Sequence, residues 1–133
     1  MPIVGLNDFS KASARLAYGE GVKNLAITQS LSGTGALRLG GAFLDRHYPH
    51  SKKILLPTPS WGNHTPIFKD SGLEVGSYRY FDKGTIGLDL KGMLEDLKNA
   101  PAKSIVLLHA CAHNPTGVDP TKDQWSEISK VIK

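Results

Sequence analysis

Cysteine is nearly absent from this chain, since Cys111 is the only one among 133 residues. An internal disulfide is therefore impossible, which favours a reducing compartment. Long apolar runs are also missing: no stretch approaches the roughly 20 residues that a membrane-spanning helix needs. The first twenty residues lack the apolar centre of a secretory signal. We therefore expect no membrane partner, and we expect any targeting peptide to lie outside these residues.

Concentrated charge is missing as well. The 16 lysines and arginines outnumber the 12 acidic residues and give a net charge of +4, but Lys52–Lys53 is their only cluster. Domains that bind nucleic acid usually carry a basic stripe or patch, so we expect no nucleic-acid partner. There is no repeat, low-complexity tract or linker, and residues 1–133 have the length of one domain.

The chain does contain a regular alternation of helical and strand-like segments. Apolar residues at helical spacing predict helices at about residues 6–18, 34–47, 63–71, 89–98 and 124–133. Short β-rich runs predict strands at residues 22–29, 53–57, 73–80 and 104–110. The last run is apolar throughout, so we expect a deeply buried strand. The alternation predicts an α/β fold with a mostly parallel sheet, in which ligands bind at the carboxyl ends of strands.

The first segment that carries chemistry is the glycine-rich run Ser30–Gly40, which follows a predicted strand and opens a helix. A helix N-terminus presents free N–H groups and partial positive charge, so it favours a phosphate. Ser32 and Thr34 add hydroxyl donors. The run is neither the dinucleotide fingerprint, because Arg38 replaces the third glycine, nor a Walker loop. The alternative is a plain helix start with a glycine-rich turn.

The second segment is Pro57–Pro66, in which Trp61 and His64 follow a predicted strand. An indole in such a loop can stack on a planar ligand, and His64 can form a hydrogen bond beneath that ligand. Alternatively, Trp61 covers the edge of the core and His64 lies on the surface. On the pattern alone, this alternative is favoured.

The third segment is His109–Gly117. If the strand persists, His109, Cys111 and His113 point to one face and resemble a zinc-binding set, although a fourth ligand or an open water position is still needed. The alternative is a strand end with small buried residues. The pair Asn114-Pro115 then forces a turn that aims the Asn114 amide at whatever binds there.

Together these segments resemble the aspartate aminotransferase family over essentially the whole chain. The strongest matches are the runs Ser32-Gly-Thr-Gly-Ala-Leu-Arg38, Pro59-Ser-Trp-Gly-Asn-His64 and Leu107-Leu-His-Ala-Cys-Ala-His-Asn-Pro-Thr-Gly117, with flanks at Gly5–Ala14 and Asp119–Trp125. The resemblance implies part of that family's large domain, which binds pyridoxal 5'-phosphate (PLP). That domain has a three-layer α/β/α architecture with a mostly parallel sheet, and residues 1–133 are expected to form an incomplete version of it.

The resemblance also implies roles for individual residues. Trp61 is expected to stack on the pyridine ring, and His64 to support the carboxylate that pairs with the ring nitrogen. Asn114 is expected to bind the phenolic oxygen of the cofactor and to lie near the substrate carboxylate, so Trp61 and Asn114 also contact substrate. His109 is expected to contact these residues rather than the cofactor itself. The PLP phosphate is expected to be held by Ser32, Gly33 and Thr34.

No catalytic residue is assigned, because the family's Schiff-base lysine matches no lysine here and is expected beyond the chain end. The substrate-binding arginine, the small domain and the later part of the large domain are expected to be absent too. The complete protein is expected to be a homodimer that transfers an amino group between L-aspartate and 2-oxoglutarate, giving oxaloacetate and L-glutamate. This chain alone is expected to be inactive.

Two other functions stay open at this point. One is a non-enzymatic truncated gene product, and the other is a zinc-dependent hydrolase that uses His109, Cys111 and His113. The run Trp61–Phe68 resembles the mitochondrial form of the family more than the cytosolic form. The mitochondrial matrix is therefore the favoured location, with the cytoplasm as the alternative.

Overall fold

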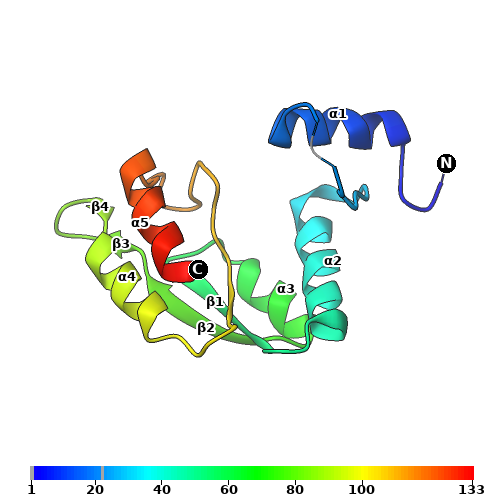
Figure 1. The fold of residues 1–133 in the computed structure, drawn as a ribbon. Helices are drawn as coiled ribbons and strands as arrows, with labels where there is room; N and C mark the ends of the chain where they lie inside the picture. The colour runs from blue at the N-terminus through cyan, green and yellow to red at the C-terminus, as the bar shows by residue number, and fades with distance from the viewer. Residues whose placement is uncertain (1, 22) are drawn as a thin grey trace.

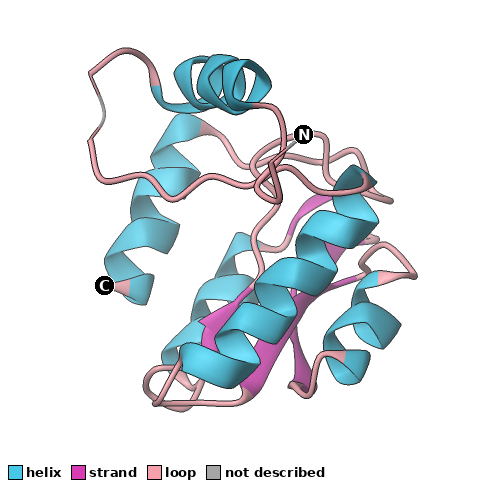
Figure 2. Ribbon diagram, turned by 90° about the vertical axis from the view of Figure 1, so that its right-hand side faces the viewer, coloured by secondary structure: helices cyan, strands magenta, loops and turns pink. Residues whose placement is uncertain are grey.

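The protein is described by a computed structural model that covers residues 2–21 and 23–133. A parallel three-stranded sheet with the order β2-β1-β5 lies at its centre. Helices cover both faces of this sheet (Figures 1 and 2). The strands are β1 (Lys53–Thr58), β2 (Glu74–Arg79) and β5 (Ile105–Val106). The predicted three-layer α/β architecture is therefore confirmed.

The alternation of side chains along β1 explains the two helical layers. Leu55, only 5% exposed, packs on one face with α4 (Leu90–Lys98) and α5 (Lys122–Ile132). Ile54 and Leu56 point to the other face, toward α2 (Ser32–His47) and α3 (His64–Asp70). Successive strand residues face opposite sides of a sheet, so this short apolar run supplies both halves of the core.

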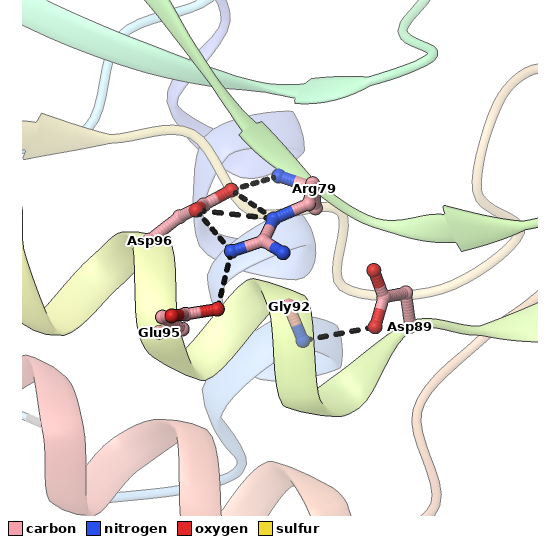
Figure 3. Close-up of polar contacts among 5 residues, drawn as sticks. All are labelled: Arg79, Asp89, Gly92, Glu95 and Asp96. Carbon is pink, nitrogen blue, oxygen red and sulfur yellow. Dashed lines mark hydrogen bonds and ion pairs between the residues drawn. The ribbon is translucent and has the colours of Figure 1, made fainter.

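Polar contacts fix helix α4 against the end of β2. Figure 3 shows Arg79, at the end of β2, with its guanidinium 2.7 Å from both the Glu95 and the Asp96 carboxylates of α4. Asp89 caps α4 by accepting a 2.9 Å hydrogen bond from the backbone N–H of Gly92. These exposed ion pairs orient α4 across the end of β2, while the buried apolar face of α4 supplies most of the stability.

The predicted strand at residues 22–29 is wrong for the described part of that range. Residues 23–29 form no strand and are exposed, and Val22 lies outside the described residues. Gln29 donates its backbone N–H to the Val4 carbonyl at 2.9 Å, and no described strand runs alongside this segment. A strand needs such a neighbour for its backbone hydrogen bonds. Helix α1 (Asn7–Tyr18), nearby in sequence, buries none of its residues and lies apart from the sheet in Figures 1 and 2.

The strand predicted at residues 104–110 is much shorter than expected and is not deeply buried. Only Ile105 and Val106 form β5, both are half-buried, and Leu108 is exposed. Within the described residues β5 pairs with β1 alone, so its other edge is uncovered. An apolar run is buried on both faces only when neighbours flank it.

The other predicted elements are confirmed. The strands at 53–57 and 73–80 correspond to β1 and β2, and each of the five helices is found within about two residues of its predicted bounds. The short hairpin of β3 (Phe81–Asp82) and β4 (Gly87–Leu88) was not predicted. In the described part of the chain, no helix has the length and apolar character to cross a membrane.

Candidate functional site

Five aromatic rings from three separate segments form one series of contacts beyond the carboxyl ends of the strands. Trp61 meets His64 edge to face at 5.4 Å, and His64 meets His109 in the same way at 5.2 Å. His109 stacks on His113 at 4.2 Å, and His113 stacks on Tyr80 at 3.9 Å. We call these five rings the aromatic series. The segments meet because each follows one of three neighbouring parallel strands, whose carboxyl ends share one edge of the sheet.

Each histidine of the aromatic series uses one ring nitrogen in a hydrogen bond. His64 Nδ1 lies 2.7 Å from Ser60 Oγ, and His113 Nδ1 lies 2.8 Å from Thr116 Oγ1. His109 Nδ1 accepts the backbone N–H of Asn114 at 3.3 Å, so the proton of the neutral His109 ring is on Nε2.

The other ring nitrogens of His109 and His113 have no such partner. Both Nε2 atoms are buried and form no hydrogen bond among the described residues. Buried polar atoms are normally paired. These two nitrogens are therefore open to a polar group that the described residues do not supply, which is a property expected of a binding site.

Burial keeps all three histidines neutral. It is the largest cause lowering the pKa of His64 and of His109, and for His64 the neighbouring His109 adds to it. The pKa of His113 falls from 6.5 to about 4, again chiefly through burial and then through His109. The aromatic series therefore carries no positive charge at neutral pH, and it presents ring faces and polar edges rather than cations.

Asn114 lies on a turn that hydrogen bonds hold on both sides. The Asp119 carboxylate accepts the backbone N–H groups of Ala112 at 2.7 Å and of His113 at 2.9 Å. The backbone N–H of Gly117 donates to the His113 carbonyl at 2.7 Å. The Asn114 side chain itself is exposed and has no hydrogen bond among the described residues. Its amide is therefore available to a ligand.

The N-terminus of α2 offers a different kind of group. The first hydrogen bond in this helix joins the N–H of Gly35 to the carbonyl of Leu31 at 3.0 Å, and no side chain caps the helix. The N–H groups of Ser32, Gly33 and Thr34 therefore have no acceptor within the helix, and all three residues are exposed. A Cβ at Gly33 would meet no atom within 4 Å, so the space beside this backbone is open.

The structure brings together some of the residues singled out in the sequence. Trp61, His64, His109 and Asn114 are linked through the ring contacts and the Asn114–His109 hydrogen bond. No described hydrogen bond or ring contact links Ser32, Gly33 or Thr34 to them, so the binding of one cofactor by both groups, which the family resemblance implies, stays a prediction. Trp61 borders a hollow of about 330 Å³ between the loop after β1 and residues 75–77 of β2.

Tyr80 and Asp119 belong to this region but were not predicted as site residues. Tyr80 stacks on His113 and donates its hydroxyl to the Val118 carbonyl at 2.6 Å. No local pattern marks Tyr80, because it directly follows β2, a different strand from the one that precedes His113. No local pattern marks Asp119 for this role either, because the N–H groups that it accepts belong to Ala112 and His113, seven and six residues earlier in the chain.

The zinc-binding arrangement that was considered for His109, Cys111 and His113 is not formed. The strand ends at Val106, so side chains no longer alternate at His109, Cys111 and His113. The two histidine rings lie face to face, and Cys111 is exposed. Among residues 2–21 and 23–133, no group of three histidines, cysteines or carboxylates has the geometry to hold a metal ion.

Comparisons with known proteins agree with the architecture and with the family resemblance. The family of class I and II aminotransferases matches residues 1–133. The chain is 53% identical to the mitochondrial aspartate aminotransferase of Gallus gallus, with all of this chain and 33% of that protein aligned. It is 55% identical to the cytoplasmic aspartate aminotransferase of Oryza sativa subsp. japonica, again over the whole chain and over 34% of the relative.

Solved structures give the same result. The aspartate aminotransferase from Saccharomyces cerevisiae cytoplasm superposes with a TM-score of 0.94 at 39% identity, covering 99% of this chain and 33% of that one. A broad specificity aminotransferase from Leishmania mexicana superposes with a TM-score of 0.93 at 43% identity, covering 99% and 34%. The chain thus spans about a third of the length of these proteins, and it belongs to the class I and II aminotransferase family.

Proposed function

We propose that the complete protein is a PLP-dependent aspartate aminotransferase that transfers the amino group of L-aspartate to 2-oxoglutarate, giving oxaloacetate and L-glutamate. The observation that carries this proposal is the identity of 53–55% to aspartate aminotransferases over all of this chain. The grouping of Trp61, His64, His109 and Asn114 at the carboxyl edge of the sheet supports it further, because ligands of α/β proteins bind there.

The N–H and hydroxyl groups at the start of α2 suit the phosphate of PLP. The uncapped N–H groups of Ser32, Gly33 and Thr34 point out of the start of α2, where the helix dipole favours a negative charge. The open space at Gly33 allows a phosphate oxygen to approach the backbone closely. In this proposal these residues anchor the phosphate, and the hydroxyl groups of Ser32 and Thr34 add donors.

The aromatic series suits a flat heterocycle. Trp61 is half-buried and meets His64 in a T-shaped contact, so an indole face that His64 does not cover can pack on a pyridine ring. His64 is held by Ser60 and is neutral, which suits a residue that supports a carboxylate at the ring nitrogen. When bound, PLP supplies an electron-withdrawing ring that stabilises negative charge on the reacting carbon of the amino acid.

Asn114 and His109 complete the proposed set. The exposed amide of Asn114 is available to donate a hydrogen bond to the phenolic oxygen of the cofactor and to contact the substrate carboxylate. Trp61 would line the same substrate space. His109 accepts the backbone N–H of Asn114 and so lies directly behind it. In this proposal these residues bind and orient the cofactor and the substrate.

The decisive experiment is a coupled transaminase assay on the complete product of the gene, purified with PLP. We expect turnover of L-aspartate with 2-oxoglutarate and an absorbance band from bound PLP. Variant Asn114→Ala should lower kcat/KM by about tenfold or more, as expected for the loss of a hydrogen bond to a charged group. A protein that binds no PLP and shows no turnover would refute the proposal.

Substrate choice, location and assembly need their own measurements. Because similar structures include an aromatic amino acid aminotransferase from Burkholderia cenocepacia at 43% identity, aromatic amino acids should be assayed as donors beside aspartate. We propose the mitochondrial matrix on the resemblance of Trp61–Phe68, although mitochondrial and cytoplasmic relatives are similarly close. Import into isolated mitochondria tests the location. Light scattering tests the proposed homodimer.

A further inference from the structure

We propose that Asp119 is a positioning residue, whose carboxylate sets the direction in which the Asn114 amide points. This inference rests on the proposed function, because it concerns how Asn114 meets the cofactor. The side-chain amide of Asn114 makes no hydrogen bond among the described residues, and only its backbone N–H has a partner, His109 Nδ1. Its orientation must therefore come from the backbone on either side of it.

The carboxylate of Asp119 holds the backbone just before Asn114. One oxygen accepts the N–H of Ala112 at 2.7 Å, and the other accepts the N–H of His113 at 2.9 Å. Ala112 has a φ of 51°, in the left-handed region that costs energy for a residue with a Cβ. Two charge-assisted hydrogen bonds from one carboxylate offset that cost and maintain the unusual turn.

His113 and Thr116 anchor the turn from two more directions. The His113 ring is 2% exposed and lies between the rings of Tyr80 and His109. The Thr116 hydroxyl lies 2.8 Å from His113 Nδ1 and accepts the backbone N–H of Val118 at 3.2 Å. Asn114 thus stands between anchored residues, with Ala112 and His113 before it and Thr116 after it.

The charge states fit these contacts. The backbone N–H groups of His113 and Ala112 lower the pKa of Asp119, so it is a carboxylate at neutral pH. Burial raises the pKa of Tyr80 to about 12, so its hydroxyl keeps the proton that it donates to the Val118 carbonyl. His113 is neutral, which leaves Nδ1 able to accept from Thr116. The turn is therefore set without any change of protonation near neutral pH.

The first variant for testing this inference is Asp119→Asn in the complete, PLP-loaded protein. The substituted amide keeps one acceptor but turns an NH₂ group toward a backbone N–H, so one of the two bonds is lost. The matched control is Asp70→Asn, because the Asp70 side chain at the end of α3 is exposed and makes no hydrogen bond or ion pair among the described residues. The readout is the pKa of the bound PLP chromophore, from its visible absorbance between about pH 5 and about pH 10.

A hydrogen bond to the phenolic oxygen favours its ionised form, so a loosened Asn114 should raise this chromophore pKa. We expect a rise of roughly one unit for Asn114→Ala and of roughly half a unit for Asp119→Asn, with no rise for Asp70→Asn. In the cofactor-free protein, the amides of Ala112 and His113 should exchange with solvent roughly tenfold faster in Asp119→Asn. Unchanged exchange would overturn the proposed anchoring.

A second variant keeps the test valid if Asp119→Asn does not fold. Thr116→Val removes the hydroxyl that joins His113 to Val118 and should raise the chromophore pKa in the same direction. If Asn114→Ala raises it while neither Asp119→Asn nor Thr116→Val does, the inference fails and the proposed function stands. If the unsubstituted protein binds no PLP, or Asn114→Ala leaves its absorbance unchanged, the site assignment itself fails.

Discussion

Acid should destabilise this protein through the histidines of the aromatic series, and His113 gives the sharpest test. Burial lowers the pKa of His113 from 6.5 in the unfolded chain to about 4 in the folded one. At mildly acidic pH the unfolded chain therefore binds more protons than the folded one. The contribution of His113 to stability is complete above about pH 7 and is lost as the pH falls from 6.5 toward 4.

The size of the loss follows from these two values. For a single site, proton linkage gives about 2 kcal/mol at about pH 5 and about 3 kcal/mol at about pH 4. The imidazole is almost fully buried, at 2% exposed, so solvent screening removes little of this effect. His64 and His109 act in the same direction because their pKa values are lowered too.

The assay is urea denaturation of the cofactor-free complete protein at several values from about pH 7.5 to about pH 5, where few carboxylates titrate. Variant His113→Phe keeps a flat ring between Tyr80 and His109 but cannot take up a proton. Between the two ends of this range, the unsubstituted protein should lose about 2 kcal/mol more than the variant.

Parallel curves for the unsubstituted protein and His113→Phe, within about 0.5 kcal/mol at every pH, would refute this reasoning. That outcome would mean that His113 binds protons equally well in the folded and unfolded chains, and that its ring is not in the buried stack.

Four shorter predictions follow from other parts of the molecule. Met93→Ala should cost about 2–5 kcal/mol in urea denaturation, because the Met93 side chain is fully buried in the core. Trp61→Ala should weaken PLP binding by about tenfold in a spectroscopic titration, whereas Trp61→Phe should keep most of it, and equal loss in both would contradict stacking. Asp96→Asn weakens the ion pair with Arg79, while the remaining amide oxygen can still accept the Arg79 backbone N–H, so most of any fall in melting temperature should disappear at high salt. A polypeptide of residues 1–133 alone should turn over aspartate at least about a hundredfold more slowly than the complete protein, because none of its lysines matches the family's Schiff-base lysine.

The elements that the sequence predicted correctly are those whose signal is local. Ile54, Leu55 and Leu56 form a run whose alternation serves two helical layers, and every helix carries an apolar stripe that appears in its own residues. The strand at 22–29 and the length of the strand at 104–110 were wrong because a strand depends on its neighbours. Backbone groups stay in an extended segment only where a second segment pairs with them.

The candidate site also combines features that local sequence predicts with features that depend on tertiary contacts. The residue types at Trp61, His64 and Asn114, and the glycine-rich start of α2, could be read from the chain because each belongs to a short motif after a strand or before a helix. The stacking of Tyr80 on His113 and the hydrogen bond from Ala112 to Asp119 could not, because Tyr80 comes from the segment after β2 and Asp119 meets Ala112 only when the turn between them folds back. Local sequence determines which groups are present and which segments are helices. Only the tertiary structure decides which groups meet, since contacts between segments distant in the chain depend on how the whole sheet is assembled.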